Sequence, residues 1–274
     1  MFSPYYASAL ARQGAAVDAD NHCALNVALY GPSGRRWTMT ERSRASVQRD
    51  REQFIVGPSR LRWQHDHLRI DIDERAAPLP RRVRGTVKLF PGMLSTFSAG
   101  LDDGNRHRWG PIAPGARVEV DLQQPASRWR GEAYFDSNEG DEPVTVPFSV
   151  WDWSRARLRD GSTAVVYDVR QTHGSERLIA ERFMPDGRVL PFEPPPRQPL
   201  PATLWRVGRS MRSEPGAPAR VLQTLEDAPF YARSLLRTEL LGETVTAVHE
   251  TLDAQRLTAW PMRFMLPWRM PRWR

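Results

Sequence analysis

Apolar and polar residues alternate with a period of two along most of the chain. Successive side chains of a strand point to opposite faces, so this alternation predicts half-buried strands. Nine runs show it: CALNVALY (23–30), LRIDID (68–73), RVRGTVKLF (82–90), ARVEVDL (116–122), WRGEAYFD (129–136), STAVVYDVR (162–170), ERLIAERF (176–183), ARVLQTL (219–225) and ETVTAVHETL (243–252). Polar turns such as DDGN, RDGS and PDG separate them. Many short strands joined by such turns predict an all-β protein of the sandwich or barrel type.

Three segments depart from this alternation. Residues 39–50, MTERSRASVQRD, show a weak helical pattern and are the one stretch that we expect to form a short helix. Residues 191–202 are rich in proline, which cannot join the interior of a ladder, so we expect an extended connection there. The tail TAWPMRFMLPWRMPRWR (258–274) holds three prolines and cannot be a regular helix throughout. It is either a last strand covering the core or an interfacial patch with its indoles at the lipid head groups.

The chain is long enough to form two domains, each with its own core. The most natural boundary lies after DEPVTVP, where WDWSRARLRDG begins a new hairpin. We therefore expect one domain over residues 1–147 and a second over residues 148–274.

Charge and composition narrow the choice of partners. The formal net charge is +7, but the basic residues are scattered and only Lys88 is a lysine, so the pattern argues against nucleic-acid binding. Weak attraction to anionic lipid head groups fits it better. Cys23 is the only cysteine, which excludes an internal disulfide and a cysteine-based metal site. The N-terminus lacks the pattern of a signal peptide, and we expect the protein on the cytoplasmic side of the membrane.

Three pairs of residues spaced two apart could carry chemistry. On a strand, Tyr134 and Asp136 share one face while Phe135 points to the other. The same spacing joins His107 to Trp109, if that segment is extended. A third pair is formed by the two tryptophans of WDW, Trp151 and Trp153, with Asp152 on the opposite side. We expect these pairs to line one pocket.

A carboxyl group in such a pocket is suited to donate a proton. Burial beside aromatic rings disfavours the carboxylate, and Glu139, Asp141 and Glu142 add like charge nearby. Both effects raise the pKa of Asp136. The ring faces would attract a carbocation at roughly 0.5 to 2 kcal/mol per well-placed ring. An acid beside such rings is what adding a proton to an alkene requires.

Plainer interpretations stay open at this point. A Tyr-x-Asp pair can be a strand end with a solvated acid, and His-x-Trp can be simple packing. A calcium loop over DSNEGDEP fails, because Gly140 and Pro147 occupy the fifth and twelfth places. His65 and His67 share a strand face but lack an evident third zinc ligand. A glycosidase could use two carboxylates such as Asp136 and Glu142, but this pattern is too generic to favour that function.

The chain resembles a known family, the bacterial carotenoid 1,2-hydratases or hydroxyneurosporene synthases. The resemblance rests on motifs that follow in order over nearly the whole chain: FSPYYA, DNHCALNVALYG, RHRWGPIAPGARVEV, EAYFDSNEGDEP, WDWSRARL, TLEDAPFYARS, AVHETL and MLPWRMPR. It implies two lipocalin-like antiparallel β-barrel or sandwich domains. It also implies an enzyme that hydrates the terminal 1,2 double bond of acyclic carotenoids such as neurosporene and lycopene in phototrophic bacteria. The expected products are 1-hydroxy carotenoids, formed without an organic cofactor or a metal.

The family's catalytic positions fall on the HRW and YFD segments, and carried over they are His107, Trp109, Tyr134 and Asp136. For this reaction we expect Asp136 to protonate C2, which leaves a tertiary cation at C1 that water attacks. Trp109 and Tyr134 would stabilise the cation, and His107 would either hold Asp136 protonated or activate the water. Exchanged roles for His107 and Asp136 are the alternative. Trp151, Trp153 and Phe135 are candidates for binding the substrate.

The expected substrate is apolar, so most of the polyene stays outside the protein or in the bilayer, and the enzyme needs an interfacial surface. Trp260, Trp268 and Trp273 are candidates for it, and the expected location is peripheral to the inner or intracytoplasmic membrane.

Family members generally carry further aromatic-rich strand material before FSPYYA. Either the start site is misassigned, or the chain is a fragment, or the first domain lacks N-terminal strands and exposes an edge. Two rival functions follow: a lipocalin-like carrier of apolar ligands without catalysis, and an inactive, N-terminally truncated relative.

Overall fold

The computed structural model describes residues 3–14, 17–31 and 35–273. Strands dominate it, and nearly all of their pairings are antiparallel, which confirms the all-β class. The contacts between residues divide the chain into two compact units. Unit 1 comprises Met1–Pro91, Ala116–Ala133 and Trp260–Arg274, and unit 2 comprises Gly92–Gly115 and Tyr134–Ala259. These units interleave along the chain, whereas we expected a single break after Pro147. That division into two folding domains stays a prediction.

Unit 1 holds a three-stranded sheet of order β1-β2-β20 and the strands β3 to β7. Its elements are α1 (Pro4–Gln13), η2 (Ala19–His22), β1 (Cys23–Leu29), β2 (Arg36–Arg42), η3 (Arg44–Ser46), β3 (Val47–Arg49), β4 (Gln53–Val56), β5 (Ser59–Trp63), β6 (Leu68–Arg75), β7 (Arg82–Pro91), α3 (Trp260–Arg269) and β20 (Arg272–Trp273). Strands β3 to β7 follow one another as antiparallel neighbours, because short polar turns join them.

Two long strands, β9 (His107–Gln124) and β10 (Ala126–Gly140), contribute residues to both units. Within unit 1, β9 pairs with β7, and the register shifts between Arg84 and Gly85. Gly85 has φ 159°, and a Cβ there would lie 2.5 Å from the backbone oxygen of Asp121. Only glycine lets the two strands approach so closely at this bulge.

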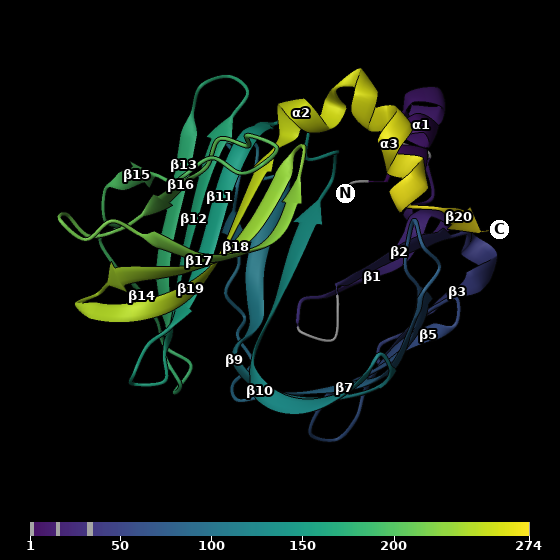
Figure 1. The fold of residues 1–274 in the computed structure, drawn as a ribbon, viewed down its shortest axis with the longest axis horizontal. Coiled ribbons are helices and arrows are strands. Elements are labelled where there is room, and N and C mark those ends of the chain that lie inside the picture. The colour runs from purple at the N-terminus through teal and green to yellow at the C-terminus, as the bar shows by residue number, and fades with distance from the viewer. Residues whose placement is uncertain (1–2, 15–16, 32–34, 274) are drawn as a thin grey trace. The chain divides into compact units, whose positions relative to one another are not determined.

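Unit 2 is built on a seven-stranded antiparallel sheet of order β14-β13-β12-β11-β19-β18-β17, whose strands run side by side in Figure 1. The elements of unit 2 beyond its shares of β9 and β10 are β8 (Ala99–Gly100), β11 (Phe148–Arg157), β12 (Thr163–Gln171), β13 (Glu176–Phe183), β14 (Val189–Pro191), β15 (Arg197–Pro199), β16 (Ser210–Arg212), β17 (Arg220–Ala228), β18 (Tyr231–Leu240), β19 (Glu243–Asp253) and α2 (Ala254–Thr258). Every sheet is open at both ends among the described residues, and none closes into a barrel.

One face of the seven-stranded sheet carries the aromatic core of unit 2. Trp153 on β11 lies opposite Tyr167 on β12 and Glu250 on β19. Glu250 in turn lies opposite Arg233 on β18. The core around this row includes Trp109, Phe148, Trp153, Tyr167 and Phe183, with Tyr134 and Trp151 packed against it.

The other face of the same sheet holds a buried polar network around Asp152. Its carboxylate accepts hydrogen bonds from Arg170 at 2.7 Å, from the Ser210 hydroxyl at 2.7 Å and from Thr251. The alternation in WDW therefore separates Asp152 from Trp151 and Trp153, as predicted.

All nine predicted strands are present, but of the short helix expected at residues 39–50 only the 3-10 turn η3 (Arg44–Ser46) is found. Residues 36–42 form β2, which pairs along its length with β1. Thr38 and Thr40 are buried on it, and β-branched residues fit a pleated surface better than a helix. The pairing of β2 with β1 outweighs the weak helical pattern of this segment.

The proline-rich connection and the tail match their predictions in part. Residues 191–202 are mainly extended, but β15 (Arg197–Pro199) pairs with β16. The tail is not one helix, because α3 ends at Arg269 and β20 then pairs with β2. The last-strand interpretation holds only for Arg272 and Trp273. Among the elements that the alternation did not predict are α1, which begins after the N-cap Ser3, and β18.

Candidate active site

The two predicted pairs meet through a direct hydrogen bond in unit 2. His107 and Trp109 begin β9, and both are buried. Tyr134 and Asp136 lie in the half of β10 that belongs to the same unit. The indole N–H of Trp109 donates to a carboxylate oxygen of Asp136 at 2.9 Å. The structure thus brings Trp109 and Asp136 into contact, as the strand argument expected.

Aromatic rings surround this hydrogen bond. The ring of Trp109 lies 5.7 Å from that of Tyr167 and 6.3 Å from that of Phe183, both edge to face. The ring of Tyr134 lies 5.5 Å from that of Trp153. Trp151 joins the same cluster through Tyr167 at 6.3 Å. Such offset and edge contacts are the favoured arrangements of aromatic pairs, so the rings form one packed wall.

Phe135 does not belong to that wall. It is half-buried and lies between Tyr134 and Asp136 on β10, where neighbouring side chains alternate in direction. It is not among the residues of the aromatic cluster. Its role in binding substrate stays a prediction.

Burial raises the pKa of the Asp136 carboxyl above its ordinary value. The hydrogen bond from Trp109 works against this rise, and the negative charge of Glu250 adds to it. The nearby Tyr134 hydroxyl and the Arg155 guanidinium also oppose the rise. Burial outweighs these stabilising contacts. The cause differs in part from our expectation, because Glu250, and not the acidic turn after Asp136, supplies the added charge.

Two polar atoms of the aromatic wall are buried and lack a hydrogen-bond partner within the described part of the chain. They are the hydroxyl of Tyr134 and the indole nitrogen of Trp153. Burial, and after it the charge of Asp136, raises the pKa of Tyr134, so this hydroxyl keeps its proton. Both atoms are therefore donors. A buried donor without a partner is costly and marks a place where a further polar group is bound.

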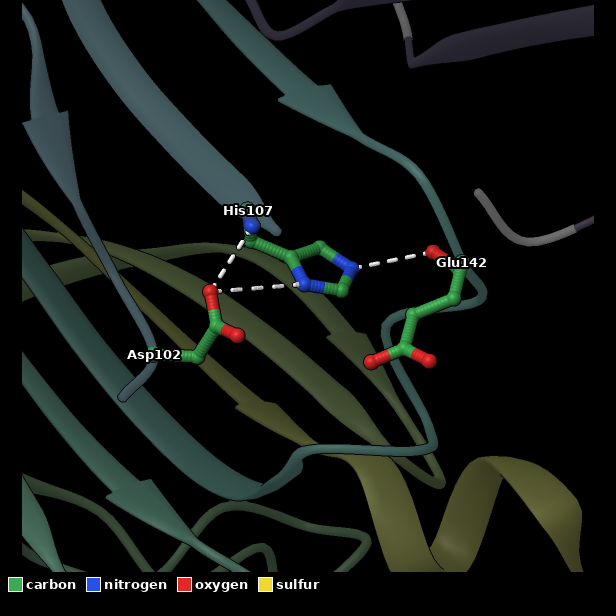
Figure 2. Close-up of side chains that lie close together, drawn as sticks. All are labelled: Asp102, His107 and Glu142. Atoms are coloured by element: carbon green, nitrogen blue, oxygen red, sulfur yellow. Dashed lines mark hydrogen bonds and ion pairs between the residues drawn. The ribbon is translucent and has the colours of Figure 1, made fainter. Parts of the chain in front are cut away.

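The ring nitrogens of His107 face Glu142 and Asp102 instead of Asp136 (Figure 2). Its Nε2 lies 2.9 Å from the carbonyl oxygen of Glu142, so Nε2–H donates to it. Its Nδ1 faces Asp102 at 3.8 Å, and the same carboxylate accepts the backbone N–H of His107 at 2.7 Å. The ring also packs edge to face on Phe148 at 4.9 Å. These contacts fix the ring at the start of β9.

Asp102, His107 and Glu142 are also the residues best placed to hold a metal among those described, since their ligand atoms lie within 4.8 Å of one another. Other partners already occupy both carboxylates, however. Asp102 accepts two backbone N–H groups, from Arg106 and His107. Glu142 accepts the Arg106 guanidinium at 2.9 Å. These hydrogen bonds explain why the three residues lie together, since they stabilise the turn before β9. Because both carboxylates are already hydrogen-bonded, the arrangement does not require a metal ion.

A small cavity adjoins the site. It has a volume of about 220 Å³, and residues of the segments 95–98 and 108–112 line it together with Ser137 and Glu139. Phe97 and Ile112 form apolar parts of the wall of this cavity, and Trp109 also lines it. Trp109 therefore connects this cavity to the Asp136 carboxyl.

Sequence reasoning missed Glu250, Arg233 and Tyr167, which share the inner face of the sheet with Trp153. Arg233 donates to Glu250 at 2.9 Å through Nε, and its Nη2 atom forms an ion pair with the same carboxylate at 2.9 Å. A signal was present in AVHETL, where strand alternation places Glu250 on one face with Val248 and Leu252. A carboxylate on an otherwise apolar face is uncommon unless it is paired or functional.

Substituting Trp109 with phenylalanine tests the hydrogen bond to Asp136. The ring is kept but the N–H that stabilises the carboxylate is lost, so the pKa of Asp136 should rise further. We expect the falling limb of the pH–rate profile, where Asp136 ionises, to move to higher pH. A profile that keeps its position would mean that this hydrogen bond does not tune the acid. The matched control is Phe97→Leu, because Phe97 packs on the same indole without a polar contact.

Comparisons with known proteins cover the whole chain. The family model described as Carotenoid hydratase CrtC matches residues 1–274. A protein of Rubrivivax gelatinosus named acyclic carotenoid 1,2-hydratase is 59% identical over 272 residues, covering 99% of this chain and 67% of its own length. Proteins of the same name from Thiocapsa roseopersicina and Cereibacter sphaeroides are 50% and 37% identical, each over 99% of this chain, and are themselves covered to 67% and 95%. All three relatives therefore align with 99% of this chain, although two of them are much longer than it is. These matches show that the chain belongs to the carotenoid hydratase family, a family of enzymes.

Proposed function

We propose that this enzyme adds water across the terminal 1,2 double bond of acyclic carotenoids to give 1-hydroxy carotenoids. The names of its relatives support the substrate class. The observation that carries the chemistry is the partly buried Asp136 carboxyl, whose pKa is raised and which Trp109 holds among aromatic rings. An acid that stays protonated at higher pH beside a ring-lined wall is suited to protonate an alkene.

The proposed reaction runs in two steps. Asp136 transfers its proton to C2 of the terminal isoprene unit, and the positive charge develops at C1. This direction gives a tertiary cation, whereas protonation at C1 would give a less stable secondary one. The faces of Trp109 and Tyr134 stabilise the cation, each at roughly 0.5 to 2 kcal/mol. Water then attacks C1 and loses a proton. Packed rings keep other water away from the cation.

His107 is best supported as a positioning residue in this reaction. Its Nε2–H donates to the Glu142 carbonyl and its backbone N–H to Asp102, so the imidazole holds the start of β9 in place. Trp109 lies two residues further along the same strand and face. A shift of His107 would move the indole that binds Asp136. The two roles that the resemblance implied for His107, keeping Asp136 protonated or activating water, stay predictions.

The lipocalin-like form of the two domains belongs to the same proposal. Antiparallel sheets with aromatic residues on one face are compatible with a fold that encloses an apolar ligand. Nearly all strand pairings are antiparallel, and the sheets are open at their ends over the described residues.

We propose that unit 1 binds a lipid surface at the head-group level and that the protein is peripheral to the membrane on its cytoplasmic side. Helix α3 exposes large rings: Trp260 is 73% exposed, Phe264 69% and Trp268 77%. Trp268 and Trp273 also line a groove of about 380 Å³ together with several prolines. Exposed indoles beside arginines suit the boundary of a bilayer. No helix among the described residues has the length and apolar character needed to span one.

Replacing Trp260 and Trp268 together with serine is expected to weaken binding to vesicles that contain anionic lipid by about tenfold or more, since each indole loses its apolar burial. Vesicle flotation measures the bound fraction. The matched control is Trp129→Ser, because Trp129 is also an exposed indole of unit 1 but lies on β10. Equal binding by both variants and the original protein would contradict the interfacial role of α3.

The function itself is tested by expressing the chain in a host that makes lycopene or neurosporene. The proposal expects more polar 1-hydroxy carotenoids in the pigment extract, identified by chromatography and mass spectrometry. Pigment that co-purifies unchanged would indicate a carrier and would contradict the proposal.

A further inference from the structure

Glu250 is a second carboxyl group on the wall that faces Asp136. It lies directly opposite Trp153 on β11, and the ring of Trp153 supports that of Tyr134 at 5.5 Å. Tyr134 is two residues from Asp136 on the same face of β10. The charge of Glu250 acts on Asp136, and also on Tyr167 and Tyr231. Glu250 therefore belongs to the same site as the proposed acid.

The environments of the two carboxyl groups differ in a way that suits different tasks. Asp136 receives an N–H from a neutral indole in an aromatic surrounding. Glu250 instead accepts the Nε–H of the Arg233 guanidinium at 2.9 Å, and the Nη2 atom of Arg233 lies 2.9 Å from the same oxygen as its ion-pair partner. A charge-assisted pair of this kind favours the carboxylate form. One group is thus set to give a proton and the other to accept one.

One buried donor lies beside Glu250 and indicates a bound polar ligand. The indole nitrogen of Trp153 is buried without a hydrogen-bond partner in the described chain. Trp153 is the direct cross-strand neighbour of Glu250, a position in which Cβ atoms are about 4.5–5.5 Å apart. A water molecule accepts from such a donor and donates to a carboxylate. Trp153 and Glu250 thus provide a donor and an acceptor for it.

We propose that Glu250 is the base of the hydration reaction, and that Trp153 holds the attacking water against it. This inference rests on the proposed function and adds the residue that receives the water's proton. The oxygen of the water forms the bond to C1 while one of its protons passes to the Glu250 carboxylate. Asp136 has by then given its own proton to C2. The cycle closes when Glu250 loses that proton to solvent and Asp136 takes one up.

The charged and titratable groups around Glu250 come from five strands. They are Arg233 and Tyr231 on β18, Arg155 on β11, Tyr167 on β12, Asp136 and Tyr134 on β10, and Glu226 on β17, opposite Arg233. His249 points to the other face of β19, where its Nε2 donates to the Ser210 carbonyl. Removing the Glu250 carboxylate therefore changes the electrostatic field at this site and removes none of the aromatic rings.

The first test compares Glu250→Gln with the original enzyme over a range of pH in a detergent assay with lycopene. Glu250→Gln should be slower by about 10²-fold, the lower end of what general acid–base help supplies. Its loss of activity at high pH, where Asp136 ionises, should move to lower pH, because the charge of Glu250 no longer raises the pKa of Asp136. An unchanged rate would contradict the role of Glu250 as the base.

The second test uses azide as a nucleophile that needs no base. In Glu250→Ala, azide should attack C1 directly and yield a 1-azido carotenoid, with Asp136 still supplying the proton to C2. The double variant Glu250→Ala with Asp136→Asn should give no azido product. An unrescued Glu250→Ala enzyme would overturn the assignment of Glu250 as the base.

Glu226→Gln is the matched control, because it removes the same charge from the other residue that lies opposite Arg233. We expect it to keep the rate and the pH profile of the original enzyme, and a loss equal to that of Glu250→Gln would overturn the specific role of Glu250. The two failures can be told apart. No hydration by the original enzyme refutes the proposed function, whereas normal hydration by Glu250→Gln refutes only this inference.

Discussion

Replacing Asp136 with asparagine is expected to lower the rate of hydration by about 10⁴-fold, the upper end of what a general acid contributes. The amide keeps the shape of the side chain, and its oxygen can still accept the indole N–H of Trp109. It cannot give a proton to C2. The folded state should survive, because Asp136 lies in an aromatic site where a neutral group replaces a carboxyl that burial already disfavours as an anion. Initial rates with lycopene and a far-ultraviolet circular dichroism spectrum measure the two effects.

Asp141→Asn is the control for this substitution. Asp141 lies in the acidic turn that follows Asp136, but it is exposed. We expect its rate to stay within a factor of two of the original. A folded Asp136→Asn enzyme that retains a tenth or more of the original rate would show that another group supplies the proton, and the exchanged assignment with His107 would then be favoured.

Replacing Asp152 with alanine is expected to destabilise the protein by about 3 kcal/mol, because it removes one partner of a largely buried ion pair. Asp152 is 5% exposed and holds Arg170, Ser210 and Thr251 together from three different strands. Without it, the Arg170 guanidinium and two hydroxyl groups lose their acceptor. Urea unfolding followed by tryptophan fluorescence should show a lower midpoint for the variant.

Asp186→Asn provides the comparison for Asp152. Asp186 also accepts an arginine, Arg188 at 2.8 Å, but both side chains are more than half exposed. Exposed pairs contribute about 0 to 1 kcal/mol, so its unfolding midpoint should barely move. Similar losses in the two variants would mean that burial does not govern the strength of these pairs.

The strands could be predicted because their pattern is local. Alternation with a period of two marks a half-buried strand in any fold, and residues 162–170 and 176–183 reappear almost unchanged as β12 and β13. Residues 39–50 were misread, since their weak helical period carried no information about the pairing of β2 with β1. β18 was missed because the sequence YARSLLRTEL breaks a simple alternation, although its inward residues are buried.

The candidate site was predictable where two residues share a strand, and less so where partners come from distant strands. The spacing rule placed Trp109 beside His107 and Asp136 beside Tyr134, and the structure then joined the two pairs through one hydrogen bond. It also placed Trp151 and Trp153 on the ring wall. The partners of His107 did not follow from spacing, because Asp102 and Glu142 come from turns whose course depends on tertiary packing.

Glu250 shows the same limit most clearly. Its own segment reveals a charge on an inward face, but its neighbours Trp153 and Arg233 are set by the register of three strands. Register depends on turns and bulges along the whole sheet. A single sequence does not fix it, and so the second carboxyl group of the site became visible only in the structure.

A titration of the Asp136 carboxyl tests the central claim most directly. Carbon-13 labelling of aspartate, with Asp136→Asn to assign the resonance, follows its ionisation by nuclear magnetic resonance. Because burial and the charge of Glu250 both disfavour the anion, the account predicts a pKa above the ordinary value of 3.8, with the high-pH loss of activity at the same pH. A carboxyl that ionises at or below 3.8 would be an anion throughout the working range and would contradict Asp136 as the proton donor.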